Sequence, residues 1–254
     1  DFGYYLYVAE IPNGDSGAQV YSNVSGFCQT AGLALWLDAS DATTLFQASN
    51  GTTPATANND VVGYWGDKSG NGKNLIQPTT DNKPLLKLAI KNGLNVVRFD
   101  GTNDVLNSTL ALPNAVSAFV VYANKASGNR VVFSTDAAAN SPLQRPNGAS
   151  ETRVWPHQSP AFMTIAAEYV ASAILWLRWN YTTDVYSAGL NTTSVADTVA
   201  RNNPGGNIQL GAANATPIDV FGGDLCEVIV SNEVLSDTAR ASVLTYLNAK
   251  WAVF

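Results

Sequence analysis

Phe221-Gly-Gly-Asp-Leu-Cys-Glu-Val-Ile-Val-Ser-Asn232 is the stretch that decides the fold, together with the residues that follow it as far as Trp251. Residues 225–230 are apolar enough to form a strand buried in a sheet. Ser236 predicts the start of a helix, because its hydroxyl can accept a backbone N–H bond in the first turn. The apolar face of that helix recurs every four residues: Ala239, Val243, Leu247 and Trp251. A strand followed by one capped helix predicts a closing element, since both parts need an existing sheet to bury against.

The rest of the chain predicts many short strands and no other helix. The predicted strands cover residues 33–38, 61–65, 95–104, 117–123, 130–134, 163–169, 174–180 and 207–211. The segments 163–169 and 174–180 predict a hairpin. Residues 141–160 contain four prolines and predict a long irregular loop on one rim. The fold class is therefore all-β, a two-sheet antiparallel sandwich with one short C-terminal helix, rather than α/β.

Composition narrows the possible partners. The formal net charge is −6, which opposes attraction to a phosphate backbone, so nucleic acid is not an expected partner. The most apolar stretch, residues 162–179, is interrupted by Glu168 and Arg178, so no membrane span is expected. The two cysteines are too few for a disulfide scaffold. Cys226 shares a strand face with apolar residues and is expected to be buried; two free thiols are favoured over a bond to Cys28.

Five segments in a fixed order resemble the concanavalin A-like, laminin-G-like jelly-roll family, of the kind found in bacteriophage virion proteins and bacterial surface proteins. The segments lie at residues 35–41, 65–72, 97–104, 221–232 and 235–251, and the resemblance covers residues 31–253. The resemblance implies a sandwich of two curved antiparallel sheets. It also implies a calcium site at one rim and binding of sugars or proteins through rim loops or the concave face.

Residues 1–30 lie outside this resemblance and predict a separate unit in front of the domain at 31–254. Their aromatic run at residues 2–8 is followed by a turn-rich segment, which fits either an extra edge strand or a docking arm. In a phage protein, this segment would attach the domain to other virion proteins or to a second copy of the chain.

A calcium site is expected at the turn that follows residues 95–99. Calcium takes six to eight oxygen ligands, and Asp100, Asn103 and Asp104 supply several, with Asp224 approaching from the closing strand. The alternative is that Asp100 and Asp104 only accept bonds from turn amides. The same alternative applies to Asp67 in the turn at residues 67–72.

A sugar site is expected where an aromatic ring stands among polar groups. Trp155 and His157 in the predicted rim loop are candidates, as are Trp176 and Arg178 if their strand face is open. Residues 175, 177 and 179 would then face the core. The alternative for Trp155 and Trp176 is partial burial under loops or in a subunit contact.

Catalysis is not expected. A retaining glycosidase needs two carboxylates about 5 Å apart, and the alternating acidic motifs that supply them on this fold are missing from the sequence. His157 has no nearby Cys and no nearby combination of an acid with a Ser, so a triad is not expected. The expected function is a non-enzymatic virion structural or adhesion protein, on a capsid or tail, that binds host-surface glycans. The alternatives are a polysaccharide-degrading enzyme or its carbohydrate-binding module, and a cellular surface or filament protein.

Overall fold

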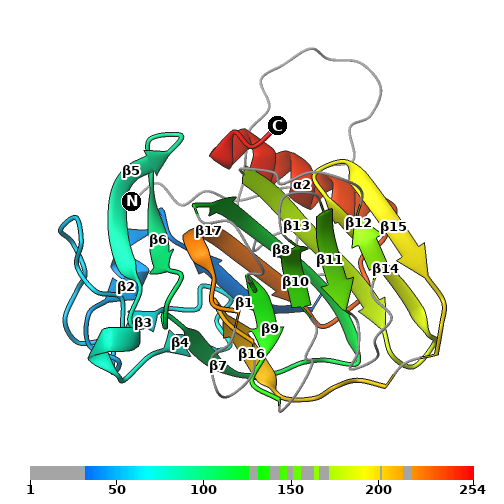
Figure 1. The fold of residues 1–254 in the computed structure, drawn as a ribbon, viewed down its shortest axis with the longest axis horizontal. Coiled ribbons are helices and arrows are strands. Elements are labelled where there is room, and N and C mark those ends of the chain that lie inside the picture. The colour runs from blue at the N-terminus through cyan, green and yellow to red at the C-terminus, as the bar shows by residue number, and fades with distance from the viewer. Residues whose placement is uncertain are drawn as a thin grey trace.

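The computed structural model describes residues 32–125, 131–137, 143–147, 151–155, 163–165, 172–200, 202–213 and 219–254. Within them the chain forms two layers of antiparallel strands and one C-terminal helix, which confirms the predicted all-β sandwich (Figure 1). Residues 1–31, and with them the predicted N-terminal unit and Cys28, lie outside the described residues.

The first layer is an eight-stranded sheet, called here the large sheet, in the order β15-β14-β13-β8-β17-β6-β5 with β1 also paired to β17. Its strands are β1 (Leu33–Asp38), β5 (Leu85–Lys91), β6 (Leu94–Asp100), β8 (Ala115–Asn124), β13 (Ser172–Asn180), β14 (Val185–Leu190), β15 (Thr193–Asp197) and β17 (Gly222–Ser231). Every residue of β17 is buried, so the stretch that predicted the fold is the central strand of this sheet.

The second layer faces the large sheet. It contains the small sheet of β2 (Leu45–Phe46), β3 (Tyr64–Trp65), β4 (Leu75–Ile76), β7 (Leu106–Ala111), β16 (Asn207–Leu210) and β9 (Phe133–Thr135). A three-stranded sheet extends it, with β10 (Leu143–Asn147) next to β9, followed by β11 (Glu151–Trp155) and β12 (Met163–Ile165). Two 3-10 turns, η1 (Ala42–Thr44) and η2 (Thr80–Asn82), complete the elements before α2.

The large sheet is buried on both faces. Its inner face packs on the second layer through the main core, which contains Leu175, Leu177 and Trp179 as predicted. Its outer face carries helix α2 (Asp237–Trp251), which packs on a separate apolar cluster that includes Trp36, Val96, Phe119, Trp176 and Trp251 (Figure 1). The predicted helix start is confirmed, because the Ser236 hydroxyl accepts a hydrogen bond from the amide of Ala239.

Two sequence predictions were wrong in the same region. Residues 141–160, predicted as an irregular loop, contain β10 and β11, which pair with each other in register. The predicted hairpin of 163–169 with 174–180 is also wrong, because β12 pairs with β11 while β13 pairs with β8 and β14. Among the described residues, β5, β7, β14 and β15 had no prediction; of these, β5 and β15 are the outermost strands of the large sheet.

The turn at residues 67–74 protects the free edge of β1. Asp67 Oδ1 accepts hydrogen bonds from the amides of Trp36 and Ser69, and Oδ2 accepts one from the amide of Lys73. The Asn71 amide donates to the carbonyl of Leu33. The turn-forming interpretation of this sequence is therefore confirmed, and the capped edge cannot pair with another chain.

Candidate functional site

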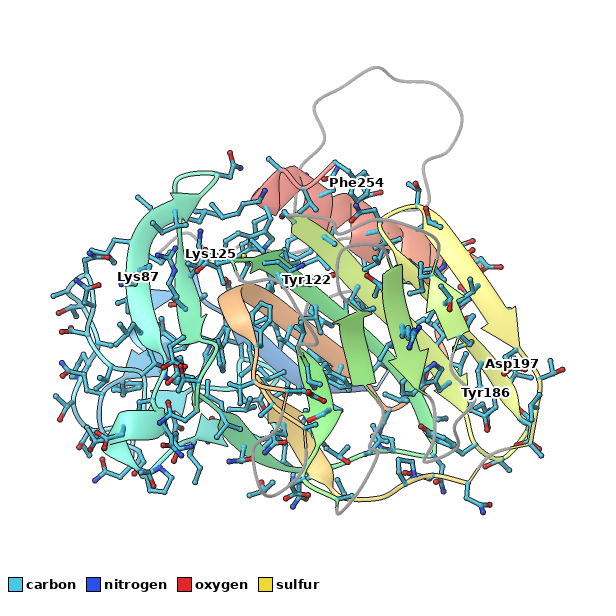
Figure 2. The ribbon with its side chains drawn as sticks, viewed as in Figure 1. Lys87, Tyr122, Lys125, Tyr186, Asp197 and Phe254 are labelled. Carbon is cyan, nitrogen blue, oxygen red and sulfur yellow. The ribbon has the colours of Figure 1, made fainter. Side chains whose placement is uncertain are left out.

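A cavity of about 240 Å³ lies where β6 ends, beside the start of β17 and the residue that follows β8. Its polar lining is Arg98, Asp100, Asp104 and Lys125, and Leu85, Phe99 and Gly222 complete the wall. Lys125 follows β8 directly and is partly exposed (Figure 2).

Strand register places these groups on the helix side of the large sheet. Leu85 on β5 pairs with Arg98 on β6, and Arg98 pairs with Asp224 on β17. Cross-strand partners share a face, and alternate residues of a strand point the same way. Val96, two residues before Arg98, packs under α2, so Arg98 and Asp224 also point to that side. The cavity therefore lies on the outer face, next to the area that α2 covers.

Asp224 is held by two cations. Arg98 donates to it through Nε at 2.5 Å and Nη2 at 3.0 Å, and Lys125 Nζ lies 3.5 Å from Oδ2. The oxygens of Asp224 therefore face cationic donors in this structure, and the expectation that Asp224 joins a calcium site stays a prediction. In the part of the chain that the structure describes, no group of three acidic, Cys or His side chains is close enough to hold a metal.

The Asp100–Asp104 turn closes on its own amides. Asp100 Oδ1 accepts hydrogen bonds from the amides of Thr102 and Asn103, and Asp104 Oδ2 accepts one from the amide of Asp100 at 2.7 Å. Burial, with a smaller contribution from the charge of Asp100, raises the pKa of Asp104 to about 7. This is the amide-bonding alternative of the sequence analysis; calcium binding by Asp100, Asn103 and Asp104 stays a prediction.

Of the four residues predicted to hold a sugar, Trp176 and Arg178 have described side chains, and neither lies on an open surface. Trp176 is 1% exposed and lies in the cluster under α2, where its indole N–H donates to the carbonyl of Asn191. Arg178 donates to the carbonyl of Leu235 and pairs with Asp237 at the start of α2. The expected open face around Trp176 is therefore wrong, because the helix covers it. His157 and the side chain of Trp155 lie outside the described residues.

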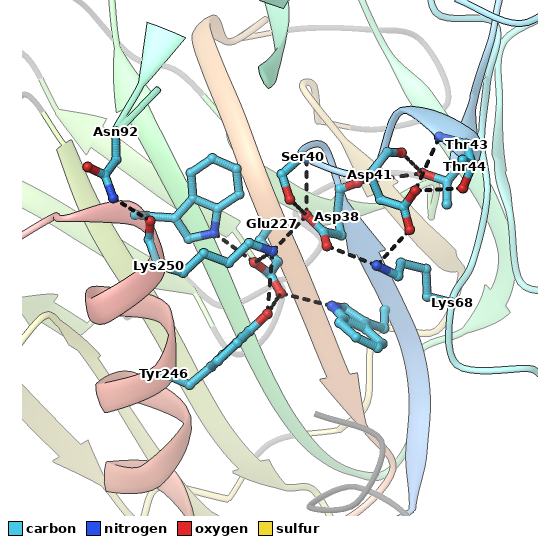
Figure 3. A network of polar contacts seen from close by, with 12 residues as sticks. Asp38, Ser40, Asp41, Thr43, Thr44, Lys68, Asn92, Glu227, Tyr246 and Lys250 are labelled. Atoms are coloured by element: carbon cyan, nitrogen blue, oxygen red, sulfur yellow. Dashed lines mark hydrogen bonds and ion pairs between the residues drawn. The ribbon is translucent and has the colours of Figure 1, made fainter. Parts of the chain in front are cut away.

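A second polar cluster lies under α2 and centres on Glu227, which is fully buried (Figure 3). Its Oε1 accepts hydrogen bonds from the Trp36 indole and the Tyr246 hydroxyl, both at 2.9 Å. Its Oε2 accepts from the Trp251 indole at 2.7 Å and from Lys250 Nζ at 2.8 Å. Four donors from β1 and α2 therefore hold this carboxylate, which fixes the helix to the sheet.

Lys250 joins this cluster to a second one at the end of β1. Its Nζ also lies 2.8 Å from Asp38 Oδ1, and Asp38 Oδ2 accepts from Lys68, which pairs with Asp41 in turn. Burial would raise the pKa of Asp38, but Lys250 and Lys68 hold it below its usual value. Burial would lower the pKa of Lys250, but Glu227 and Asp38 raise it. The lysine is therefore charged across the neutral range.

Cys226 carries a free, buried thiol, as predicted. No helix among the described residues is long and apolar enough to span a membrane.

Comparison with known proteins gives a likeness of fold. No family model matches the sequence, and no curated protein matches it. The structure is similar to a Trypanosoma rangeli sialidase solved with sialic acid, with a TM-score of 0.56 at 10% identity, over 86% of this chain and 33% of that chain. It is also similar to a GH54 α-L-arabinofuranosidase, with a TM-score of 0.55 at 16% identity, over 75% of this chain and 51% of that one. The chain therefore spans a third to a half of these neighbours and shares the fold of part of two carbohydrate-active proteins.

Proposed function

We propose that the chain is a non-enzymatic glycan-binding protein of the concanavalin A-like, laminin-G-like jelly-roll type. The observation that carries the proposal is the cavity at the end of β6, where cations and carboxylates line one concave site. Sites of this kind bind ligands through a few placed polar groups on an apolar wall. The likeness of fold to part of a sialidase and part of an arabinofuranosidase supports the same class of ligand.

The state of Glu227 supports the non-enzymatic part of the proposal. A glycosidase needs two carboxyl groups on either side of the scissile bond, about 5–5.5 Å apart for retention and about 6.5–9.5 Å apart for inversion. Glu227 is an acidic residue of the closing strand β17. It has no exposed surface, and four donors already occupy its oxygens. A substrate cannot reach it unless α2 leaves the sheet.

The experiment is a glycan array with the purified chain, followed by an assay for released reducing ends on every glycan that binds. The proposal expects retention of at least one glycan class and no release above buffer. Retention of nothing across bacterial and host polysaccharides would contradict the binding function. Release above buffer that is lost in Asp104→Asn, a change in the lining of the cavity, would contradict the non-enzymatic function.

A second candidate is a carbohydrate-binding module of a larger enzyme. The partial span of the matched enzymes, 33% and 51% of their chains, favours it. Activity of a longer natural chain that carries this domain, reduced when the domain is removed, would support this candidate.

The place of action that we propose is the surface of a virion, a phage capsid or tail, with an outer cell surface as the alternative. The support is the resemblance of the five sequence segments to domains of that kind. Residues 1–30 would make the contact with other virion proteins or with a second copy. A density map of particles that shows these residues against a shell or fibre tests the proposal, and a map of particles without the chain would contradict it.

A further inference from the structure

We infer that the cavity between Arg98, Asp100, Asp104 and Lys125 binds one uncharged sugar ring through two neighbouring hydroxyl groups. This inference rests on the proposed glycan-binding function and assigns it a site and a ligand class. It places the ligand beside α2 on the outer face of the large sheet, in a cavity whose lining does not include Trp176.

The first argument is the unused hydrogen-bonding capacity of the lining. Arg98 uses Nε and Nη2 on Asp224, and no hydrogen bond within the described residues involves its Nη1. Lys125 Nζ lies 3.5 Å from Asp224 Oδ2 and makes no hydrogen bond within the described residues. Asp100 Oδ2 and Asp104 Oδ1 are the unused acceptors, because the other oxygen of each carboxyl is bonded to turn amides. Two donor groups and two acceptor groups therefore line one cavity.

This combination matches neighbouring hydroxyl groups. Each hydroxyl both donates and accepts, so a pair of them can donate to the two carboxyl groups while accepting from the arginine and the lysine. Hydrogen bonds to ionised partners are shorter and roughly twice as strong as neutral ones. A ligand with a single hydroxyl would leave some of these groups unpaired on binding, which costs affinity.

The second argument is the charge balance of the site. Arg98 and Lys125 carry two positive charges, and Asp224, Asp100 and, above its pKa of about 7, Asp104 carry the negative charges beside them. A sugar with a carboxylate would find no excess of positive charge and would have to displace Asp224 from Arg98. That displacement would leave a carboxylate buried without its partner, because Asp224 is 1% exposed. The site therefore favours an uncharged ring.

The third argument is size and shape. At about 30 Å³ per water, 240 Å³ holds about eight water molecules, which suits one sugar ring and is below the usual ~300–1,000 Å³ of pockets for larger ligands. Leu85, the cross-strand partner of Arg98, provides an apolar wall for the C–H face of the ring. The site would hold a terminal sugar rather than the middle of a chain.

The experiment is a titration of the ¹⁵N-labelled chain with methyl α-D-mannopyranoside and methyl β-D-galactopyranoside, which carry neighbouring hydroxyls, followed by two-dimensional amide spectra. D-glucuronate is the charged probe, and tetrahydropyran-2-methanol is the ring without neighbouring hydroxyls. We expect saturable shifts of the amides of Arg98, Asp104, Lys125 and Gly222 with at least one of the two glycosides. The affinity for the other two probes is expected to be at least tenfold weaker.

Variants separate the site from the fold. Lys125→Ala removes one donor from a partly exposed side chain and is expected to weaken binding severalfold. Asp104→Leu removes an acceptor and is expected to weaken it at least tenfold. Asp81→Asn, at an exposed residue that is not part of the cavity lining, is the matched control and is expected to bind as the parent does. Unchanged amide spectra outside the cavity show that each variant is folded.

The outcomes are distinct. Saturable shifts at other residues, with a positive glycan array, would overturn this site and leave the proposed function standing. Tighter binding of D-glucuronate than of both glycosides would overturn the uncharged ligand. If no probe shifts any amide signal and the glycan array shows no retention, both this site and the proposed glycan-binding function are contradicted.

Discussion

Replacing Lys250 by Met tests whether the buried cluster under α2 holds the helix on the sheet. Methionine keeps the length of the side chain and removes the charge that lies 2.8 Å from both Glu227 and Asp38. Both carboxyl groups are buried, so the variant leaves them without this cation. Removing one partner of a buried ion pair costs about 3–5 kcal/mol. For a chain of this size, that loss corresponds to a fall in Tm of about 6–20 °C.

The assay is urea unfolding of Lys250→Met and the parent, followed by tryptophan fluorescence, because Trp36 and Trp251 lie in the cluster and report its loss. Lys73→Met is the matched control: its side chain makes no ion pair in the described part of the chain, and we expect a change within about 0.5 kcal/mol. The double variant Glu227→Gln with Lys250→Met should lose less free energy of unfolding than the two single variants lose together, because the two side chains contact each other. A loss below about 1 kcal/mol in Lys250→Met would refute the reasoning.

Three further predictions follow from single contacts. Asp104→Asn is expected to raise Tm at pH 8 and to change it little at pH 3.5. The pKa of this carboxyl is near 3.8 in the unfolded chain and about 7 in the folded one, so its cost in stability grows as the pH rises between these values and is complete above pH 7; the amide removes this cost. An equal change at both pH values in thermal unfolding would speak against the burial of this group. Asp67→Ala is expected to cost roughly 2–3 kcal/mol of stability, because it removes the carboxylate that accepts hydrogen bonds from β1 and from its own turn. Equilibrium unfolding that matches the parent would show that Asp67 does not stabilise this edge. Trp176→Ala is expected to cost about 3–5 kcal/mol of stability, because the side chain is buried, and to leave glycan retention by the folded fraction unchanged. Loss of glycan retention at the stability of the parent would instead show that Trp176 takes part in sugar binding.

The closing strand and helix could be predicted from sequence because each carries its own local signal. β17 is a nearly continuous apolar run, and α2 has a serine cap and a four-residue apolar repeat. The same holds for β1 and β8, which are buried and apolar along most of their length. Strands with these signals can be identified without knowing their neighbours.

The sequence did not show which strands pair or which element covers each face of the sheet, because both depend on distant parts of the chain. The alternation in β13 correctly placed Trp179 in the core and Trp176 on the other face, but not which element covers that face. Only the position of α2, more than fifty residues later, decides that Trp176 is buried. Proline-containing β10 is a strand because β11 pairs with it, which its own sequence does not indicate.

The candidate site was predicted in part. Asp100, Asp104 and Asp224 were identified as a polar group at the end of a strand, and the structure places Asp100 and Asp104 in one cavity with Asp224 bonded to its wall. Arg98 and Lys125 were missed, because nothing in their own segments shows that β17 brings them to the same carboxylate. Arg98 could have been identified only by knowing that it lies opposite Asp224 in the neighbouring strand. That knowledge depends on the strand register, which the sequence does not show.

The most direct test of glycan binding without catalysis is mass spectrometry of glycans eluted from the immobilised chain after a long incubation with a mixed polysaccharide library. The account predicts that the retained glycans elute with the masses of the starting material. Shortened products that accumulate with time, or eluates that match those from an unrelated β-sandwich control, would contradict it.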